Sequence, residues 1–282
     1  MLRRRAKMCI AVALALLAVI APASAASDHP WLAAHDTAQD TLERRIVPPP
    51  GFTRVAVAAG SWGAWLRGLP MKPAGAAVML FDGRQKPRQD VHAAVIDIDV
   101  GHRDLQQCAD AVMRLRAEWL YAQGRHGDIG FNYTGGGRVP FSRFVKGERP
   151  NESGKTWSAG KATGDDYAAF KRYMQHVFAF AGTYSLEREL QAVQHRADMQ
   201  IGDVFIRGGF PGHAVLVADM VRNVTTGEQR FLLLQSYMPA QDIHVLKNLQ
   251  TTDGSPWYRS DFTGSLITPE WQFATNNLKR WP

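Results

Sequence analysis

The chain has 282 residues, of which 45% are hydrophobic, and its formal net charge is +7. This composition excludes a disordered or low-complexity chain and is typical of a globular protein with a sizeable buried core. No basic run interleaved with aromatic residues occurs, so the sequence argues against a nucleic-acid partner.

The first 25 residues show the three regions of a secretory signal peptide. A basic start at residues 3–7 precedes an uncharged apolar stretch at residues 9–20, and small residues follow. Ala23 and Ala25 satisfy the small-x-small rule, which predicts cleavage after Ala25. Cleavage removes four bases and no acid, so the remaining chain is nearly neutral. The sequence therefore predicts a periplasmic or secreted protein, with an uncleaved anchor as the alternative.

No later segment has the run of about 18 consecutive apolar residues that a membrane-spanning helix needs. We therefore do not expect an integral membrane protein.

Cysteine usage is the most informative feature of the composition. Of the two cysteines, Cys9 leaves with the signal peptide and Cys108 remains. A lone cysteine in an oxidising compartment has no partner for an intramolecular disulfide. Its two common explanations are a buried inert side chain and a catalytic nucleophile.

In chain order, the first half predicts short elements and then one long helix. Consecutive prolines at residues 48–50 exclude a helix there. The patterns then predict a strand, a helix and two more strands at residues 52–58, 61–69, 78–81 and 91–100. The long helix is predicted over residues 102–123, with Asp104 as its N-cap and Gln107 completing a capping box. Cys108 then falls in its first turn.

The second half predicts helices followed by an antiparallel sheet. Residues 125–165 are expected to form a long loop with short strands. Two helices and three β-rich runs follow, at residues 165–181, 185–194, 203–206, 214–219 and 230–235. An aromatic tail from Asn248 should wrap around and pack. This order of elements predicts an α+β fold in a single domain over residues 26–282.

Cys108 and His213 form the candidate catalytic pair. Unpaired backbone N–H groups and the positive end of the dipole at a helix start favour a thiolate and an oxyanion. His213 follows Gly212 at the start of a predicted strand, which is a rigid place for a general base. Gln235 ends the next apolar strand, within cross-strand reach of the imidazole. Asp219 and His244 are weaker candidates for this orienting role.

The stretch from Ile201 to Val217 resembles the Gly-Asp, strand, turn, Gly-His, strand signature of NlpC-type cell-wall peptidases and CHAP amidases. These families are bacterial relatives of papain. The resemblance implies a papain-like fold in which Cys108 is the nucleophile, His213 the base and Gln235 the group that orients the imidazole. It also implies that residues 125–195 are a large insertion between the nucleophile helix and the sheet.

The sequence departs from those families at the nucleophile, where Gln107-Cys108-Ala109-Asp110 replaces their Asp-Cys-Ser-Gly. The chain after the signal peptide also resembles domain of unknown function 4846, a family of exported bacterial proteins. Three segments carry this resemblance: Leu105-Gln106-Gln107-Cys108-Ala109-Asp110-Ala111, Gly209-Phe210-Pro211-Gly212-His213 and Gln235-Ser236-Tyr237-Met238-Pro239-Ala240-Gln241-Asp242. The family brings no activity with it.

Together these patterns predict an exported thiol hydrolase of amidase or endopeptidase type. Its substrate would be peptidoglycan stem peptide or another envelope acyl compound. The candidates for binding the substrate or the oxyanion are Gln106, Gln107, Arg207 and Gly212, besides the Cys108 N–H. We expect no cofactor, and no metal site because no Cys/His set has zinc-ligand spacing.

Two alternatives remain open. A non-catalytic periplasmic binding protein would keep the papain-like frame without its chemistry. A glycan-binding or glycosidase module would use Trp257 and Trp271 with Asp97 or Asp99, whose carboxylates alternate along a predicted strand.

Overall fold

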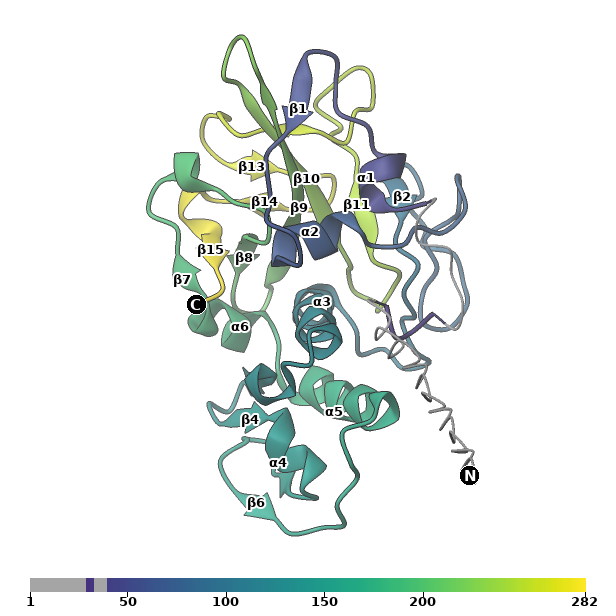
Figure 1. Cartoon of the computed structure of the whole chain (residues 1–282), viewed down its shortest axis with the longest axis vertical. Coiled ribbons are helices and arrows are strands. Elements are labelled where there is room, and N and C mark those ends of the chain that lie inside the picture. Colours follow the sequence, from purple (N-terminus) through teal and green to yellow (C-terminus); the bar gives the residue numbers. More distant parts are fainter. Residues whose placement is uncertain (1–28, 33–39) are drawn as a thin grey trace, which may run out of the picture.

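A computed structural model describes residues 29–32 and 40–282. The predicted signal peptide and its cleavage site lie outside the described residues. Within them, α-helices combine with antiparallel strands, which confirms the prediction of a mixed α+β fold (Figure 1). No helix in this described part is long and apolar enough to cross a bilayer.

One large antiparallel sheet dominates the described chain. Its strands are β1 (Phe52–Arg54), β2 (His92–Val95), β7 (Gln191–Ala192), β8 (Val204–Arg207), β9 (His213–Asn223), β10 (Gln229–Gln235), β11 (His244–Leu246), β12 (Tyr258–Arg259) and β15 (Leu278–Arg280). The order is β2-β11-β10-β9-β8-β15-β7, with β1 paired to β9 and β12 paired to β10. The three β-rich runs predicted from the sequence are the core of this sheet.

The β9–β10 hairpin is buried on both faces. Along β9, Ala214, Leu216 and Ala218 point into one hydrophobic core, whereas Val215 and Val217 point into another. Side chains alternate between the faces of a strand, so a strand covered on both sides is apolar at every position. This explains why the sequence shows continuous apolar runs here.

The described chain has six α-helices, two of which pack on the first of these faces. They are α1 (Leu42–Arg45), α2 (Trp62–Arg67), α3 (Cys108–Ala122), α4 (Phe141–Val145), α5 (Tyr167–Phe180) and α6 (Thr183–Glu189), with short 3-10 turns η1 (His126–Asp128), η2 (Arg196–Asp198) and η3 (Thr275–Asn277). Both α2 and α3 pack directly against β9. In Figure 1, α3 lies just below the sheet, and α5 and α4 lie further down.

Most of residues 125–195 form the lower half of the molecule in Figure 1. This half contains two small hairpins, made by β3 (Gly130–Asn132) with β4 (Arg138–Pro140) and by β5 (Arg149–Pro150) with β6 (Trp157–Ser158). It packs on the side of α3 away from the sheet, through α5. The α4 helix inside it was not predicted from the sequence.

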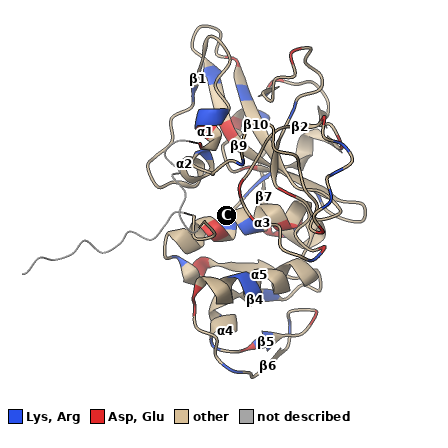
Figure 2. Ribbon diagram, turned by 90° about the vertical axis from the view of Figure 1, so that its right-hand side faces the viewer, with Lys and Arg blue, Asp and Glu red and all other residues tan. Residues whose placement is uncertain are grey.

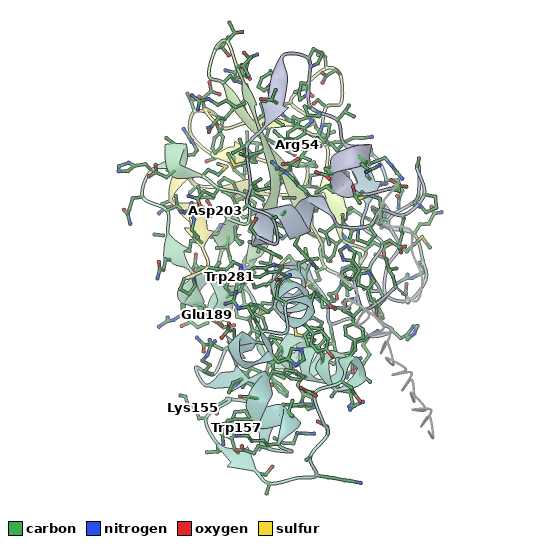
Figure 3. All side chains as sticks on the ribbon, in the orientation of Figure 1. Arg54, Lys155, Trp157, Glu189, Asp203 and Trp281 are labelled. Atoms are coloured by element: carbon green, nitrogen blue, oxygen red, sulfur yellow. The ribbon has the colours of Figure 1, made fainter. Side chains whose placement is uncertain are left out.

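The tail covers the second face of the sheet, as predicted, and it also supplies strands. Its hairpin of β13 (Leu266–Ile267) and β14 (Gln272–Phe273) precedes β15, which pairs with β8. The buried side chains of Tyr258, Phe273 and Leu278 belong to the second core. Trp281 lies between Asp203 and Glu189 in Figure 3, where the two halves of the molecule meet, and its ring is 6.1 Å from that of Phe131.

The helix that carries Cys108 begins one turn later than predicted. Asp104 is not its N-cap, because the Asp104 carboxylate accepts hydrogen bonds from the Ala240 N–H at 2.7 Å and from the Gln107 side chain at 3.0 Å. The Asp110 carboxylate accepts the Gln107 N–H at 3.1 Å and closes the turn there. Cys108 is therefore the first residue of α3.

Three other predicted elements are shorter than expected. Residues 78–81 make only isolated bridges, the predicted strand 91–100 shortens to β2, and the strand 52–58 shortens to β1. Helix α6 begins before Ser185, because the Ser185 hydroxyl accepts the Gly182 N–H at 3.1 Å from inside the first turn.

Positive and negative residues are interspersed along the ribbon, and neither sign gathers over one face in the view of Figure 2.

Candidate active site

Cys108 and His213 line one cavity of about 590 Å³ at the start of β9. The two residues reach it from different sides. Cys108 comes from α3, which packs on the face of Ala214, whereas the His213 ring packs against Trp271 at 5.3 Å and Phe273 at 5.8 Å on the tail side. The cavity therefore lies at the end of the strand, where the two faces of the sheet meet.

The Cys108 sulfur lies among the backbone N–H groups of Cys108, Ala109 and Ala214. The first two belong to the first turn of α3, where N–H groups have no partner inside the helix. Burial and the nearby Asp110 carboxyl raise the pKa of the Cys108 thiol to about 11, and the three N–H groups offset only part of this. The helix start therefore favours a thiolate, as expected, but burial outweighs this effect and leaves the thiol neutral near pH 7.

His213 is almost completely buried, and its imidazole is neutral near pH 7. Burial lowers the pKa of His213 to about 4, and the hydrogen bond to Gln235 recovers only part of that shift. The bond joins His213 Nε2 to Gln235 Oε1 at 2.8 Å. Gln235 was predicted to reach this ring, and it does.

The tautomer of His213 follows from the next contact along the chain of hydrogen bonds. Gln235 Nε2 donates to the Glu270 carboxylate at 2.8 Å. Because a carboxylate oxygen accepts, the Gln235 amide must present its oxygen to His213. His213 Nε2 therefore carries the proton and Nδ1 keeps its lone pair, which is the form that a general base needs.

A buried ion pair stands behind this arrangement. Lys86 Nζ lies 2.6 Å from Glu270 Oε1, and it also lies 5.3 Å from the centre of the Tyr237 ring. Tyr237 in turn packs edge-on against His213 at 4.8 Å. Sequence reasoning missed Lys86 and Glu270, because nothing near them in the chain marks a site. It also gave no role to Tyr237, although this residue lies two positions after Gln235.

Two of the four predicted substrate or oxyanion residues line the cavity. Gln107 and Gly212 do, whereas Gln106 and Arg207 do not. Gln106 is buried, and its Oε1 accepts a hydrogen bond from Arg114 at 3.1 Å. Arg207 is exposed because it ends β8 with its side chain in solvent. These two predictions were therefore wrong in placing the residues beside the cavity.

Gly212 is required by close packing. A Cβ atom at this position would lie 2.3 Å from Thr183 Oγ1 and 2.6 Å from the Gly209 carbonyl oxygen. Real Cβ atoms do not approach so closely, and the neighbouring atoms include backbone. The glycine therefore allows the turn before His213 to press against α6.

The weaker candidates for orienting the imidazole have other partners. The buried Asp219 carboxylate pairs with Arg54 at 2.7 Å, a residue labelled in Figure 3, and with Arg67 at 2.6 Å. His244 Nδ1 contacts the Asp242 carbonyl oxygen at 2.9 Å. Neither side chain is hydrogen-bonded to His213 within the described residues, so Gln235 fills this role.

The carboxylates considered for glycosidase chemistry, Asp97 and Asp99, lie at a second cavity of about 660 Å³. Burial tends to raise the pKa of Asp99, but Arg114 and Lys171 outweigh it, so the pKa lies below its usual value. An ionised carboxylate between two cations is no proton donor. Trp257 is buried and donates its indole N–H to a backbone carbonyl, so its ring has no free face for a sugar.

No group of three or more His, Cys, Asp or Glu side chains within residues 29–32 and 40–282 is placed to hold a metal ion.

Comparison with known proteins adds a family and no activity. Neither the curated proteins nor the solved structures gave a match to this chain. The model of one family, the domain of unknown function (4846), matches residues 42–280. Because this match spans most of the sequence, the chain belongs to the DUF4846 family.

Proposed function

We propose that the protein is an exported thiol hydrolase of papain-like type, with Cys108 as nucleophile, His213 as general base and Gln235 as the positioning residue. The observation that carries this proposal is the Gln235 contact, which leaves Nδ1 of His213 as a base at the cavity that Cys108 also lines. A buried histidine with a fixed tautomer and a free cysteine that line one cavity match the needs of acyl transfer.

The reaction would begin from a neutral pair. The Cys108 sulfur attacks the carbonyl carbon of an amide or ester while its proton passes to His213 Nδ1. The oxyanion that forms accepts hydrogen bonds from the N–H groups around the sulfur, which are those of Cys108, Ala109 and Ala214. His213 then returns the proton to the leaving group, and water hydrolyses the thioester with the same imidazole as base.

The substrate class rests on location and on family resemblance. Predicted export and the likeness to NlpC-type and CHAP hydrolases favour peptidoglycan stem peptide or another acyl compound of the cell envelope. No support for this choice comes from the DUF4846 family itself.

The test compares four proteins: the wild type, Cys108→Ala, His213→Ala and Gln235→Ala. Each is incubated with purified muropeptides and with a panel of 4-nitrophenyl esters, and the products are followed by mass spectrometry and absorbance. We expect turnover of at least one of these substrates by the wild type, a reduced rate for Gln235→Ala, and little or none for Cys108→Ala and His213→Ala. Equal turnover by wild type and Cys108→Ala, or none by any protein, contradicts the proposal.

A second candidate function is a non-catalytic binding protein on the same frame. The neutral thiol and neutral imidazole of the unliganded site favour it, because an inactive relative needs no ion pair. The two functions separate in one experiment: a binding protein retains the muropeptide intact, with the same affinity in wild type and Cys108→Ala, whereas a hydrolase releases products.

A further inference from the structure

Two large apolar side chains are exposed beside the candidate nucleophile. Phe210 is 91% exposed and Met238 is 66% exposed, and both line the cavity that contains Cys108 and His213. Phe210 lies in the turn before β9, and Met238 follows the end of β10. Apolar side chains gathered at the mouth of a cavity are typical of a surface that binds another apolar group.

The interior of the cavity continues this apolar character. Its wall includes Leu105, Phe178, Ala181, Pro211 and Trp271. Burying an apolar group of a ligand against such side chains gains free energy in proportion to the area removed from water, which corresponds to about fourfold in affinity per CH₂.

Charge makes the choice of ligand narrower. Among the described residues that line the cavity, the charged types are Asp104 and Asp110 alone, and no Lys or Arg is present. Lys86 lies behind the His213 ring and is paired with Glu270, so it is not available to a ligand. Burial raises the pKa of the Asp110 carboxyl well above its usual value, so the repulsion comes from the exposed Asp104 carboxylate. A carboxylate on the substrate would thus meet the Asp104 carboxylate and no cation, which is unfavourable at short range.

We propose that the cavity takes acyl groups that are apolar and uncharged, with Phe210 and Met238 as the residues that contact them. This inference rests on the proposed hydrolase function and narrows its substrate. An aliphatic acyl amide or ester fits these contacts. Of the two substrate classes proposed above, the inference therefore favours an uncharged acyl compound of the envelope over a stem peptide with carboxylates next to the scissile bond.

The test measures kcat/KM for three esters that share one leaving group: 4-nitrophenyl acetate, 4-nitrophenyl hexanoate and the mono-4-nitrophenyl ester of adipic acid. The adipate ester has the length of the hexanoate ester and ends in a carboxylate. We expect kcat/KM for hexanoate to exceed that for acetate by roughly 10-fold or more, because each buried CH₂ contributes about fourfold. We also expect it to exceed kcat/KM for adipate by roughly 10-fold or more, because the adipate carboxylate is disfavoured in this cavity. Raising the salt concentration should narrow the gap between hexanoate and adipate, because salt screens the repulsion.

Variants identify the contact residues. Phe210→Ser and Met238→Ser should each lower kcat/KM for hexanoate several-fold, and should lower kcat/KM for acetate by a smaller factor, because acetate has no chain to bury against them. Val224→Ser is the matched control, since Val224 is 74% exposed and lies outside this cavity. Val224→Ser should leave kcat/KM for both esters unchanged.

The outcomes separate this inference from the proposed function. The inference is overturned if the adipate ester is turned over as well as the hexanoate ester, or if both serine variants behave like the control. The hydrolase proposal still stands in that case, provided that acetate turnover depends on Cys108.

If no ester is hydrolysed through Cys108, the hydrolase proposal fails. The apolar character of the cavity is then tested by calorimetry, which measures the binding of hexanamide and of adipic acid monoamide to Cys108→Ala. Preference for hexanamide supports an apolar cavity, and equal or reversed binding contradicts it.

Discussion

Gln235 joins the imidazole of His213 to a buried carboxylate, and this contact determines which ring nitrogen is the base. Glu270 holds the nitrogen of the Gln235 amide, so the amide oxygen faces His213. Lys86 keeps the Glu270 charge compensated at 2.6 Å. The chain from Lys86 to His213 thus works as a positioning device, because removing any member frees the amide to rotate.

Replacement of Gln235 tests this device. Gln235→Ala should lower kcat/KM about 10-fold, since the loss of one hydrogen bond that holds the ring costs about 1–1.5 kcal/mol. Gln229→Ala, at the other end of the same strand and away from the cavity, should leave kcat/KM unchanged. The prediction concerns steady-state kinetics, and a Gln235→Ala enzyme as active as the control would contradict it.

The pH dependence of kcat/KM follows from the two neutral groups. His213 accepts a proton only when neutral, so activity is lost as the pH falls through its pKa of about 4. Cleavage of an amide also needs the thiol proton, because His213 passes it to the leaving amine, and this proton is lost as the pH rises through about 11. We expect a plateau from about pH 5 to about pH 10, because kcat/KM reports the ionisations of the free enzyme. An acid limb near the ordinary histidine pKa of about 6.5 would contradict this account.

At the residue scale, the sequence predicted Cys108, His213 and Gln235 but not the residues behind them. Each of the three follows a local pattern, namely a helix start, a Gly-His strand start and a polar end to an apolar strand. Lys86 and Glu270 meet across 184 positions of the chain. No local pattern marks such a contact, because only the wrapping of the tail over the sheet creates it.

At the scale of elements, the turn between β8 and β9 places His213. A Cβ at position 212 would meet Thr183 and two backbone carbonyl oxygens, so Gly212→Ala must push α6 and the turn apart. We expect it to lower the free energy of unfolding by about 1–3 kcal/mol, the usual cost of overpacking. Urea denaturation at neutral pH measures this.

Gly127→Ala is the matched control for that substitution. A Cβ at Gly127 has nothing within 4 Å, and no positive backbone φ applies there. Its free energy of unfolding should change by about 1 kcal/mol or less, because only the flexibility of the chain is altered. Equal destabilisation by the two substitutions would show that the packing of Gly212 does not position the turn.

The start of α3 shows why element boundaries escaped prediction. Asp104 and Gln107 have the spacing of a capping box, and so do Gln107 and Asp110. A distant group determines which pair caps the helix, because the Ala240 N–H donates a hydrogen bond to the Asp104 carboxylate. The long apolar strands and the α5 helix were predictable, since their periodicity spans many residues.

At the scale of the whole molecule, Asp219 ties the first segments of the chain to the sheet. Its buried carboxylate on β9 pairs with Arg54 from β1 and with Arg67 from α2. Asp219→Asn should lower the free energy of unfolding by about 3–5 kcal/mol, because it leaves the buried Arg67 and the half-buried Arg54 without a counterion. Thermal or urea unfolding will measure the change.

Asp261 offers the matched control for Asp219. It pairs with Arg259 at 2.7 Å, and both side chains are largely exposed. Asp261→Asn should cost about 0–1 kcal/mol, since water screens exposed pairs. A loss for Asp219→Asn as small as this would mean that the three segments are held together by their apolar contacts alone.

The class of fold and the central sheet were predictable from the whole sequence, whereas the arrangement of residues 125–195 was not. Within this segment the α5 helix was predictable, but the strands and the α4 helix before it are so short that they show no clear hydrophobic periodicity. The role of the tail as a strand donor, through β15, also depends on β8 lying open beside it, which only the folded sheet provides.

The proposed covalent step offers the most direct test of the hydrolase. The protein is mixed with an activated ester, quenched in acid within its first turnovers, and analysed by intact mass spectrometry and peptide mapping. The account predicts an added acyl mass on Cys108 that disappears with time in the wild type. It also predicts that the adduct forms far more slowly in His213→Ala and is absent in Cys108→Ala. An unmodified Cys108, or an adduct that forms at the same rate without His213, would contradict the account.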